Sequence, residues 1–270
     1  MKFVQKSKNK RAVCAVLKIN RSTVYYKKKR VADEKEPEVV SVFKRHNGNY
    51  GSRRIKAELE RKKVIVSGRR IIRILKRNGL EPKYGRKKLV RNIYTNKDER
   101  YIAGNLIRNK AATMSGQICH TDFTELKCKD GKLFVSGIID AYDKTAVVKC
   151  GEKQSKELVK ETIELMSKPP EILHSDRGSQ YTSNLIREYL DEKKVKRSMS
   201  APYCSYENAM IETFWKTLKV EIGDTRNLTK AELQMVIEYQ VYYYNHERIH
   251  SSINYLTPIE KRTLSFSKVS

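Results

Sequence analysis

The sequence is poor in cysteine and has no long apolar run. Its five cysteines are scattered without a C-x-x-C pair, which is typical of reduced intracellular thiols rather than of a disulfide framework or a zinc knuckle. No stretch of about eighteen or more apolar residues is present, and no apolar segment follows the basic N-terminus. These absences exclude a transmembrane span and argue against a secretion signal. We therefore expect a cytoplasmic protein with no membrane partner.

Acidic residues are scarce relative to basic ones. The chain has 57 Lys and Arg against 31 Asp and Glu, and this net charge of +26 indicates a polyanionic partner. The excess is uneven, because residues 1–110 carry 34 basic against 9 acidic side chains, whereas residues 111–270 carry 23 against 22. The charge pattern predicts a phosphate-binding N-terminal part joined to a nearly neutral enzyme core.

The length of 270 residues and the hydrophobic content of 39% leave room for two domains, and no internal repeat or low-complexity tract is present. We divide the chain into a basic N-terminal helix or tail (1–35), a helical DNA-binding module (36–80), a basic linker (81–113), a catalytic core with a C-terminal helix (114–262) and a tail (263–270). In the first segment, the run from Asn20 to Thr23 is typical of a helix N-cap. That segment is either a helix-turn-helix fragment or a short helix with a solvated basic tail.

The module at 36–80 is predicted to contain three helices. Apolar residues recur at helical spacing in three runs, the third helix is expected to begin near Ser67, and Asn78-Gly79 is a typical C-terminal stop. The second and third helices carry candidate phosphate contacts: Arg53, Arg54, Arg69, Arg70 and Arg73. The alternative is a solvated basic face without DNA contact, but the charge excess favours phosphate binding.

From about residue 114 the pattern becomes α/β. Strand-like runs are followed by alternating helices and strands, in the order strands 117–128, 132–140 and 145–150, helix 154–167, strand 171–175, helix 182–192, strand 195–199 and helix 207–221. A further helix is expected after an N-cap at Thr229, and Thr257-Pro258 is expected to end the helical region.

Three carboxylates occupy positions in this pattern from which they could converge: Asp122 in the first strand, Asp176 after the fourth, and Glu212 beside the apolar stripe of the last core helix. Phosphoryl transfer uses two hard cations roughly 3.5–4 Å apart, and Mg²⁺ prefers carboxylate ligands. On spacing alone, ordinary surface acids remain the alternative. Asp140 and Asp143 are rival carboxylates, although their position in a turn is typical of capping acids.

Longer motifs surround these carboxylates in a fixed order. They are TDFTEL (121–126), IIDAYDK (138–144), HSDRGSQYTS (174–183), ENAMIETFWKTLKVE (207–221) and YYYNHERIHSSINYLTP (242–258). Together they closely resemble the OrfB-type transposases of bacterial insertion sequences, in the IS-three group, which are relatives of retroviral integrases. The resemblance covers nearly the whole chain, from about Lys10 to Arg262.

This resemblance implies an α/β fold in which a ribonuclease H-like catalytic core, a mixed five-stranded sheet with helices, follows a small all-α helix-turn-helix module. It implies a DDE triad of Asp122, Asp176 and Glu212 that holds two Mg²⁺ ions, with Mn²⁺ as a substitute. The expected partners are transposon-end and target DNA, a second copy of the chain on paired ends, and a companion or fusion protein from an upstream reading frame.

Further residues follow from the same resemblance. The family's YN-x-x-R-x-H motif falls on Asn245, Arg248 and His250, which are expected either to buttress the active site or to contact DNA. Lys216 and Lys219 follow Glu212 by one and two helical turns and are candidate contacts to the strand being joined. The chain departs from the family pattern at Gln117, where Trp is frequent, at Tyr203, in place of Gly, and at Glu207, in place of Asp.

The sequence thus predicts a DNA transposase that cleaves and joins strands at insertion-sequence ends by phosphoryl transfer. No covalent protein–DNA intermediate is required, and no Ser or Tyr nucleophile motif is visible. Two alternatives remain open: a nuclease of the same fold that cannot join strands, and a DNA-binding regulator or decayed transposase that occupies its own ends. The basic module and the C-terminal motif disfavour the nuclease, and the intact triad disfavours the regulator.

Overall fold

The computed structural model describes residues 10–18, 20, 33–84, 103–108, 110–201 and 205–266. Tyr203, most of the linker predicted at 81–113 and most of the N-cap predicted at Asn20–Thr23 lie outside these ranges. The first described helix is α2 (Lys10–Val16). Within the described ranges, no helix combines the length and apolarity needed to cross a bilayer.

Three short helices form the predicted module: α4 (Glu36–Arg45), α5 (Ser52–Arg61) and α6 (Gly68–Arg77). The side chain of Ser67 accepts a hydrogen bond from the backbone N–H of Arg70, which confirms that α6 begins with a Ser N-cap. Each helix turns an apolar stripe inward, and the stripes meet in one cluster that contains fully buried Val39, Ile55 and Ile71. The module is therefore held by its own small core.

The second unit is a mixed five-stranded sheet with strand order β3-β2-β1-β4-β5. Its strands are β1 (Ile118–Cys128), β2 (Gly131–Asp140), β3 (Ala146–Gly151), β4 (Ile172–Ser175) and β5 (Lys196–Met199). The first three strands pair antiparallel, as the predicted meander requires, whereas β4 and β5 join β1 in parallel. This sheet and the helical module confirm the predicted fold class.

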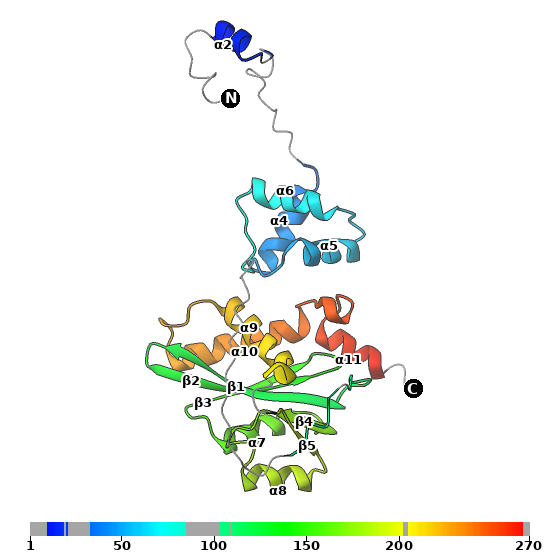
Figure 1. Ribbon diagram of the computed structural model, residues 1–270, viewed down its shortest axis with the longest axis vertical. Coiled ribbons are helices and arrows are strands. Elements are labelled where there is room, and N and C mark those ends of the chain that lie inside the picture. Colours follow the sequence, from blue (N-terminus) through cyan, green and yellow to red (C-terminus); the bar gives the residue numbers. More distant parts are fainter. Residues whose placement is uncertain are drawn as a thin grey trace.

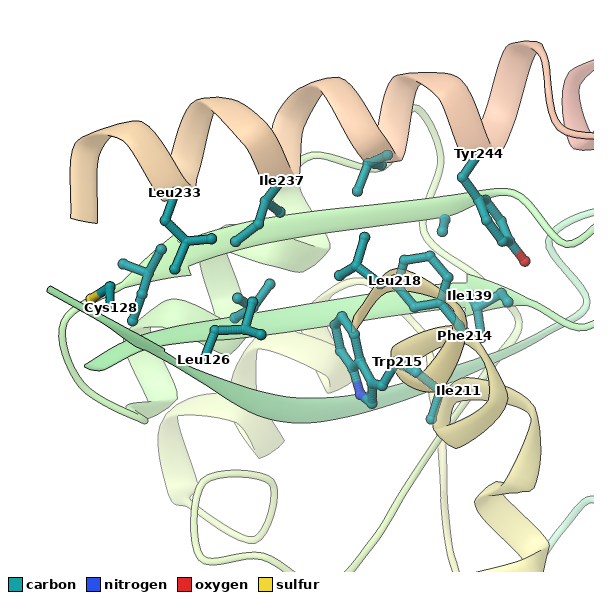
Figure 2. Packing of buried hydrophobic residues seen from close by; sticks show 14 residues of the cluster. Leu126, Cys128, Ile139, Ile211, Phe214, Trp215, Leu218, Leu233, Ile237 and Tyr244 are labelled. Carbon is teal, nitrogen blue, oxygen red and sulfur yellow. The ribbon is translucent and has the colours of Figure 1, made fainter. Parts of the chain in front are cut away.

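Helices cover both faces of the sheet (Figure 1). One face carries α7 (Lys156–Glu164) and α8 (Asn184–Glu192), and the other carries α9 (Ala209–Ile222) and α10 (Lys230–His246), with the short η1 turn (Ser205–Asn208) leading into α9. Figure 2 shows Phe214, Trp215 and Leu218 of α9 on the same face of the sheet as Leu233 and Ile237 of α10, and all five belong to one buried cluster. The predicted N-cap at Thr229 is present as a complete capping box with Glu232.

The chain stays helical after the position where we expected helices to end. After η2 (Ser251–Ile253), Pro258 begins helix α11 (Pro258–Phe266), so Thr257-Pro258 starts a helix and the prediction of a stop is wrong. The physical reason is that Pro is favoured in the first turn, where its missing N–H is not needed. Thr257 and Glu260 also exchange hydrogen bonds, with Glu260 N–H donating to Thr257 Oγ1 and Thr257 N–H donating to Glu260 Oε2.

The helical module packs on the C-terminal part of the core (Figure 1). Ile249, 1% exposed, belongs to the hydrophobic cluster of the module although it follows α10. The hydroxyl of Tyr50 accepts a hydrogen bond from Ile249 N–H at 2.9 Å, and Tyr243 OH lies 3.0 Å from His46 Nδ1. At the edge of this contact, Arg61 forms an ion pair with Glu260 at 2.9 Å. The two units therefore share buried apolar and polar contacts.

Candidate active site

The register of the parallel strands brings Asp122 and Asp176 together. His120 of β1 pairs with His174 of β4, and their rings stand edge to face at 5.2 Å on one side of the sheet. Asp122 and Asp176 each follow two residues later. Because side chains two residues apart on a strand point to the same face, Asp122 leaves β1 on the side that α9 covers, and Asp176 comes directly after the end of β4.

The carboxylate of Asp122 is half-buried beneath α9. The indole Nε1–H of Trp215 donates a hydrogen bond to Asp122 Oδ2 at 3.2 Å. The indole also lies over Gly137, the cross-strand partner of Asp122, where an added Cβ would stand 2.4 Å from the ring. Only a glycine at position 137 therefore leaves room for Trp215 to reach this carboxylate.

The charges of Asp176 and Glu212 act on the carboxyl of Asp122. The pKa of Asp122 is raised to about 6, chiefly by burial, and the negative charges of Asp176 and Glu212 raise it further. Hydrogen bonds from the Phe123 backbone and from Trp215 oppose this rise. Partial burial also raises the pKa of Glu212. Both charges reach Asp122, so residues from β1, the end of β4 and α9 lie in one region.

Asp176 is positioned by a tight turn after β4. Its Oδ1 accepts a hydrogen bond from Gly178 N–H at 2.9 Å, which is an Asx-turn. A side chain at position 178 would crowd this oxygen, because an added Cβ would stand 3.0 Å from it. Asp176 itself is exposed to solvent, as is Glu212.

Glu212 is positioned by the attachment of α9 to β1. Asn208, the residue before the helix, donates a hydrogen bond from Nδ2 to Thr121 O at 3.2 Å, and its Oδ1 lies 3.0 Å from His120 Nδ1. These contacts tie the start of α9 to the residues that precede Asp122. The roles of Asn208 and Trp215 were not predicted from the sequence. The spacing could have indicated the role of Trp215, because it follows Glu212 by three residues and the two side chains are therefore neighbours on one helix.

The three carboxylates suit a hard divalent cation by their chemistry. They offer only oxygen donors, and a cation between them would offset the burial and the repulsion that raise the pKa of Asp122. Across the described ranges, no three His, Cys, Asp or Glu side chains stand close enough together to hold a metal ion as they are. The donor chemistry fits such an ion, and the three side chains would have to move closer together to bind it.

The rival carboxylates Asp140 and Asp143 have structural surroundings. Asp140 accepts hydrogen bonds from the backbone N–H groups of Gly116, Tyr142 and Asp143. Asp143 is fully buried and accepts from Ser115 Oγ, from Thr145 and from Arg262 Nε at 2.8 Å. Their oxygens are occupied by the turn after β2, as expected for capping acids.

The predicted DNA contacts on the helical module and on α9 fall into two groups. Arg53, Arg69 and Arg73 are exposed on α5 and α6, and Lys216 and Lys219 are exposed on α9, one and two turns after Glu212. Arg54 is partly buried and donates a hydrogen bond from Nε to Ile249 O at 3.1 Å, while Arg70 pairs with Asp33 at 2.7 Å. The structure therefore leaves the first group facing solvent and engages Arg54 and Arg70 within the protein.

Arg248 and His250 are buried. Arg248 Nε donates to Glu221 Oε1 at 2.8 Å in an ion pair whose side chains are 4% and 0% exposed. Tyr84 OH also donates to Glu221 Oε1 at 2.6 Å. These contacts give Arg248 a structural role inside the protein rather than a contact to DNA. Neither side chain lies on the outer surface.

Two residues beside Asp176 also bond within the core. His174 Nδ1 lies 2.9 Å from Ser198 Oγ, and His174 Nε2 lies 2.9 Å from Ser200 Oγ. Arg177 Nε donates to Ser200 O at 2.8 Å. Glu207, the departure from the family pattern, accepts a hydrogen bond from Ala201 N–H at 2.8 Å. These bonds hold the ends of β4 and β5 together around the loop that carries Asp176.

Comparisons with known proteins agree with this architecture. The integrase core domain family model matches residues 112–205, a second integrase core domain model matches residues 193–258, and the HTH-like domain model matches residues 30–88. The transposase of insertion sequence element IS904 from Lactococcus lactis is 32% identical over 229 residues, which cover 82% of this chain and 90% of the relative. The chain belongs to the insertion-sequence transposases.

As a member of this family, the chain is an enzyme of the integrase-type polynucleotidyl transferases, as the sequence predicted. Transposase InsF of insertion sequence IS3A from Escherichia coli K12 is 26% identical and covers 92% of both chains, which supports the predicted IS-three grouping. A chain of the simian T-cell lymphotropic virus intasome, solved in complex with the PP2A regulatory subunit B56 gamma, is 13% identical. It has a TM-score of 0.50 and covers 84% of this chain and 74% of its own length. This last likeness concerns the fold alone.

Proposed function

We propose that this transposase cleaves and joins DNA strands at insertion-sequence ends through Asp122, Asp176 and Glu212. The observation that carries the proposal is the action of the Asp176 and Glu212 charges on the half-buried carboxyl of Asp122. A half-buried carboxylate that two further carboxylates repel is a costly arrangement unless a cation or a proton joins it. The strand register and the attachment of α9 support the same grouping.

The three carboxylates would hold the divalent ions, Mg²⁺ or Mn²⁺. Bound there, such ions would polarise the phosphoryl group and activate the attacking hydroxyl, and a pair of them would serve both the attacking and the leaving oxygen. Trp215 would orient Asp122 by its hydrogen bond, and Asn208 would position Glu212 by holding the start of α9 against β1. Exposed Lys216 and Lys219 would bind the phosphates of the strand that lies along α9.

Arginines on the helical module would bind the terminal DNA by phosphate contacts, with Arg53, Arg69 and Arg73 as the exposed candidates. The work would take place on the bacterial nucleoid in the cytoplasm, with two copies of the chain on paired ends and, where needed, a companion from the upstream frame. The net charge of +26 supports a polyanionic substrate.

The direct test follows cleavage and strand joining on labelled DNA that carries the element's ends, with Mg²⁺ and with Mn²⁺. We expect Glu212→Gln to lower both rates by about 10³-fold or more, since losing a metal ligand removes several kcal/mol of transition-state stabilisation. Glu188→Gln, an exposed change on α8, should leave both rates unchanged. Product that survives Glu212→Gln would refute the triad. Cleavage without joining would identify a nuclease, and binding without product, even with the companion protein added, would identify a regulator.

A further inference from the structure

Three buried polar side chains stand just before the three candidate carboxylates. A histidine lies two residues before each aspartate, and an asparagine lies four residues, about one helical turn, before the glutamate. They are His120, His174 and Asn208, and their exposed fractions are 6%, 0% and 4%. The ring of His120 contacts both of the others. It therefore links the elements that carry all three carboxylates.

One contact of His120 is a directional hydrogen bond to the start of α9. Asn208 Nδ2 donates to Thr121 O at 3.2 Å, so the amide oxygen of Asn208 is turned toward the histidine. This oxygen lies 3.0 Å from His120 Nδ1 and can only accept, so Nδ1 carries the proton. An N–H bond thus runs from the strand of Asp122 to the residue directly before the helix of Glu212.

The other contact of His120 is with β4. The rings of His120 and His174 stand edge to face, with their centroids 5.2 Å apart. Leu106 N–H donates to Ser198 Oγ at 2.9 Å, which leaves the Ser198 hydroxyl to donate to His174 Nδ1. The other ring nitrogen, Nε2, then donates to Ser200 Oγ. Burial chiefly lowers the pKa of His174 to about 4, so the ring is neutral and has the single proton that these bonds require. Because both nitrogens are used, the ring that His120 meets is held in place.

The ligands of a metal ion need support of this kind, because the affinity for the ion falls steeply when they lie at the wrong spacing. Asp122 is oriented by Trp215, but the hydrogen bond to Asp176 Oδ1 comes from its own turn. The position of Asp176 relative to Asp122 therefore depends on how β4 is held against β1. The position of Glu212 depends in the same way on how the start of α9 is held there. His120 takes part in both attachments.

We propose that His120 is a positioning residue of the candidate active site. The proposal rests on the proposed function and adds to it a side chain that need not touch the ion or the DNA. Its Nδ1–H bond holds the start of α9, and its ring holds the end of β4, both relative to Asp122 on the same strand. The backbone positions of the three carboxylates thus stay fixed, and rotation of their side chains is enough to surround an ion.

The first test measures the affinity for Mg²⁺ without DNA. Trp215 is the only tryptophan and its indole N–H donates to Asp122, so the NMR signal of this group reports an ion at the site. His120→Phe keeps a ring but loses the N–H, and His120→Asn keeps an N–H near the position of Nδ1 but loses the ring. Each variant should raise the Kd for Mg²⁺ by about tenfold, as the loss of support around metal ligands generally does. A wild-type Kd in both folded variants would overturn the proposal.

His46→Phe is the matched control. His46 is another buried histidine, 3% exposed, and its Nδ1 lies 3.0 Å from Tyr243 OH in the contact between the two units. This variant should lower the thermal stability and leave the Kd for Mg²⁺ unchanged. An equal rise in its Kd would show that any loss of stability weakens the site, and would refute the positioning role. If Mg²⁺ does not shift the Trp215 signal in wild-type protein, the proposed triad fails as well.

The second test separates DNA binding from the chemical steps. With labelled end DNA and Mg²⁺ near the wild-type Kd, kcat for cleavage should fall by about fivefold or more in His120→Phe, while KM for DNA stays unchanged. Raising the Mg²⁺ concentration should restore part of kcat, because it refills the weakened site, whereas a loss of folded protein would not respond in this way. A fall in kcat that no Mg²⁺ concentration changes, or a raised KM with unchanged kcat, would contradict the proposal.

Discussion

At the scale of single residues, the charge of Asp122 is the feature with the clearest consequence. A carboxyl whose pKa is about 6 in the folded protein holds a proton more tightly than the same group in the unfolded chain, where the ordinary value is 3.8. As pH rises from about 4 to about 6, the unfolded chain releases its proton first. The free energy of unfolding therefore falls across this window and is lower above it.

Replacing Asp122 by Asn should remove this penalty. Above pH 7 and without metal, we expect Asp122→Asn to raise the free energy of unfolding by about 1–2 kcal/mol. This value is smaller than a shift of roughly two pKa units would give, because solvent screens the partly exposed side chain. The gain should vanish below about pH 4. Thermal unfolding at both pH values measures this, with Asp191→Asn on the surface of α8 as the control.

The same variant also tests the cation. Mg²⁺ that binds only the folded protein raises its stability, so added Mg²⁺ should stabilise the wild type and leave Asp122→Asn nearly unchanged. An equal response in both proteins would place the ion elsewhere. This readout requires no DNA and no activity.

The sequence alone led to the proposal of the three carboxylates, but the contacts that position them could not be predicted from it. Long motifs gave the positions of Asp122, Asp176 and Glu212. The contacts of Trp215 and Asn208 depend on the way α9 crosses β1 and on the absence of a side chain at Gly137. The motif also left Arg248 with two possible roles, and only the fold shows that Glu221 is its buried partner.

At the scale of elements, α9 is held at both ends. Its start is tied to β1 by Asn208, and its last turn carries Glu221, whose carboxylate accepts from Arg248, Tyr84 and Gln240. Lys83 Nζ donates to the backbone oxygen of the same residue at 3.0 Å. Lys83 and Tyr84 follow the helical module, so the chain leaving that module is attached to the helix of Glu212.

Removing one partner of this buried pair should be strongly destabilising. Arg248→Met leaves a fully buried carboxylate without its cation, and we expect the free energy of unfolding to fall by about 3–5 kcal/mol in urea titrations. The additional change Glu221→Gln should recover part of the loss, because the amide has no charge. Arg226→Gln, which breaks an exposed pair with Asp224, should cost less than about 1 kcal/mol. A similarly small loss for Arg248→Met would contradict the role assigned to the pair.

Local sequence patterns predicted the positions of most helices and strands, and the error at Pro258 also has a local cause. Apolar periodicity and N-caps at Ser67 and Thr229 predicted most helices and strands because those signals lie within a few residues of each other. Pro258 was misjudged because the same residue can end one helix or begin another. The capping contacts between Thr257 and Glu260 decide between these outcomes.

At the scale of the whole molecule, the helical module and the catalytic core are expected to unfold together. Ile249 fills the module's hydrophobic cluster from the far end of the chain, so Ile249→Ala should lower the free energy of unfolding by about 2–5 kcal/mol. Urea unfolding followed by the fluorescence of Trp215, the only tryptophan, and by hydrogen exchange of α5 amides should give one shared midpoint.

The exposed Ile65 in the same module provides the matched control for that experiment. Ile65→Ala should change stability by no more than about 0.5 kcal/mol, since the side chain is 83% exposed. Separate midpoints for the two probes in wild-type protein would show that the units unfold independently. The sequence could not reveal this coupling, because nothing local marks Ile249 as part of a core some 200 residues upstream.

The position of Ile249 also determines when the helical module can complete its core during synthesis. A ribosome makes the chain from its N-terminus, so α4, α5 and α6 emerge long before the residue that completes their core. A nascent chain, or one cut short by a premature stop codon before Ile249, lacks that residue and the Tyr50 contact to it. We therefore expect the helical module to reach its stable fold only after the catalytic core has been translated.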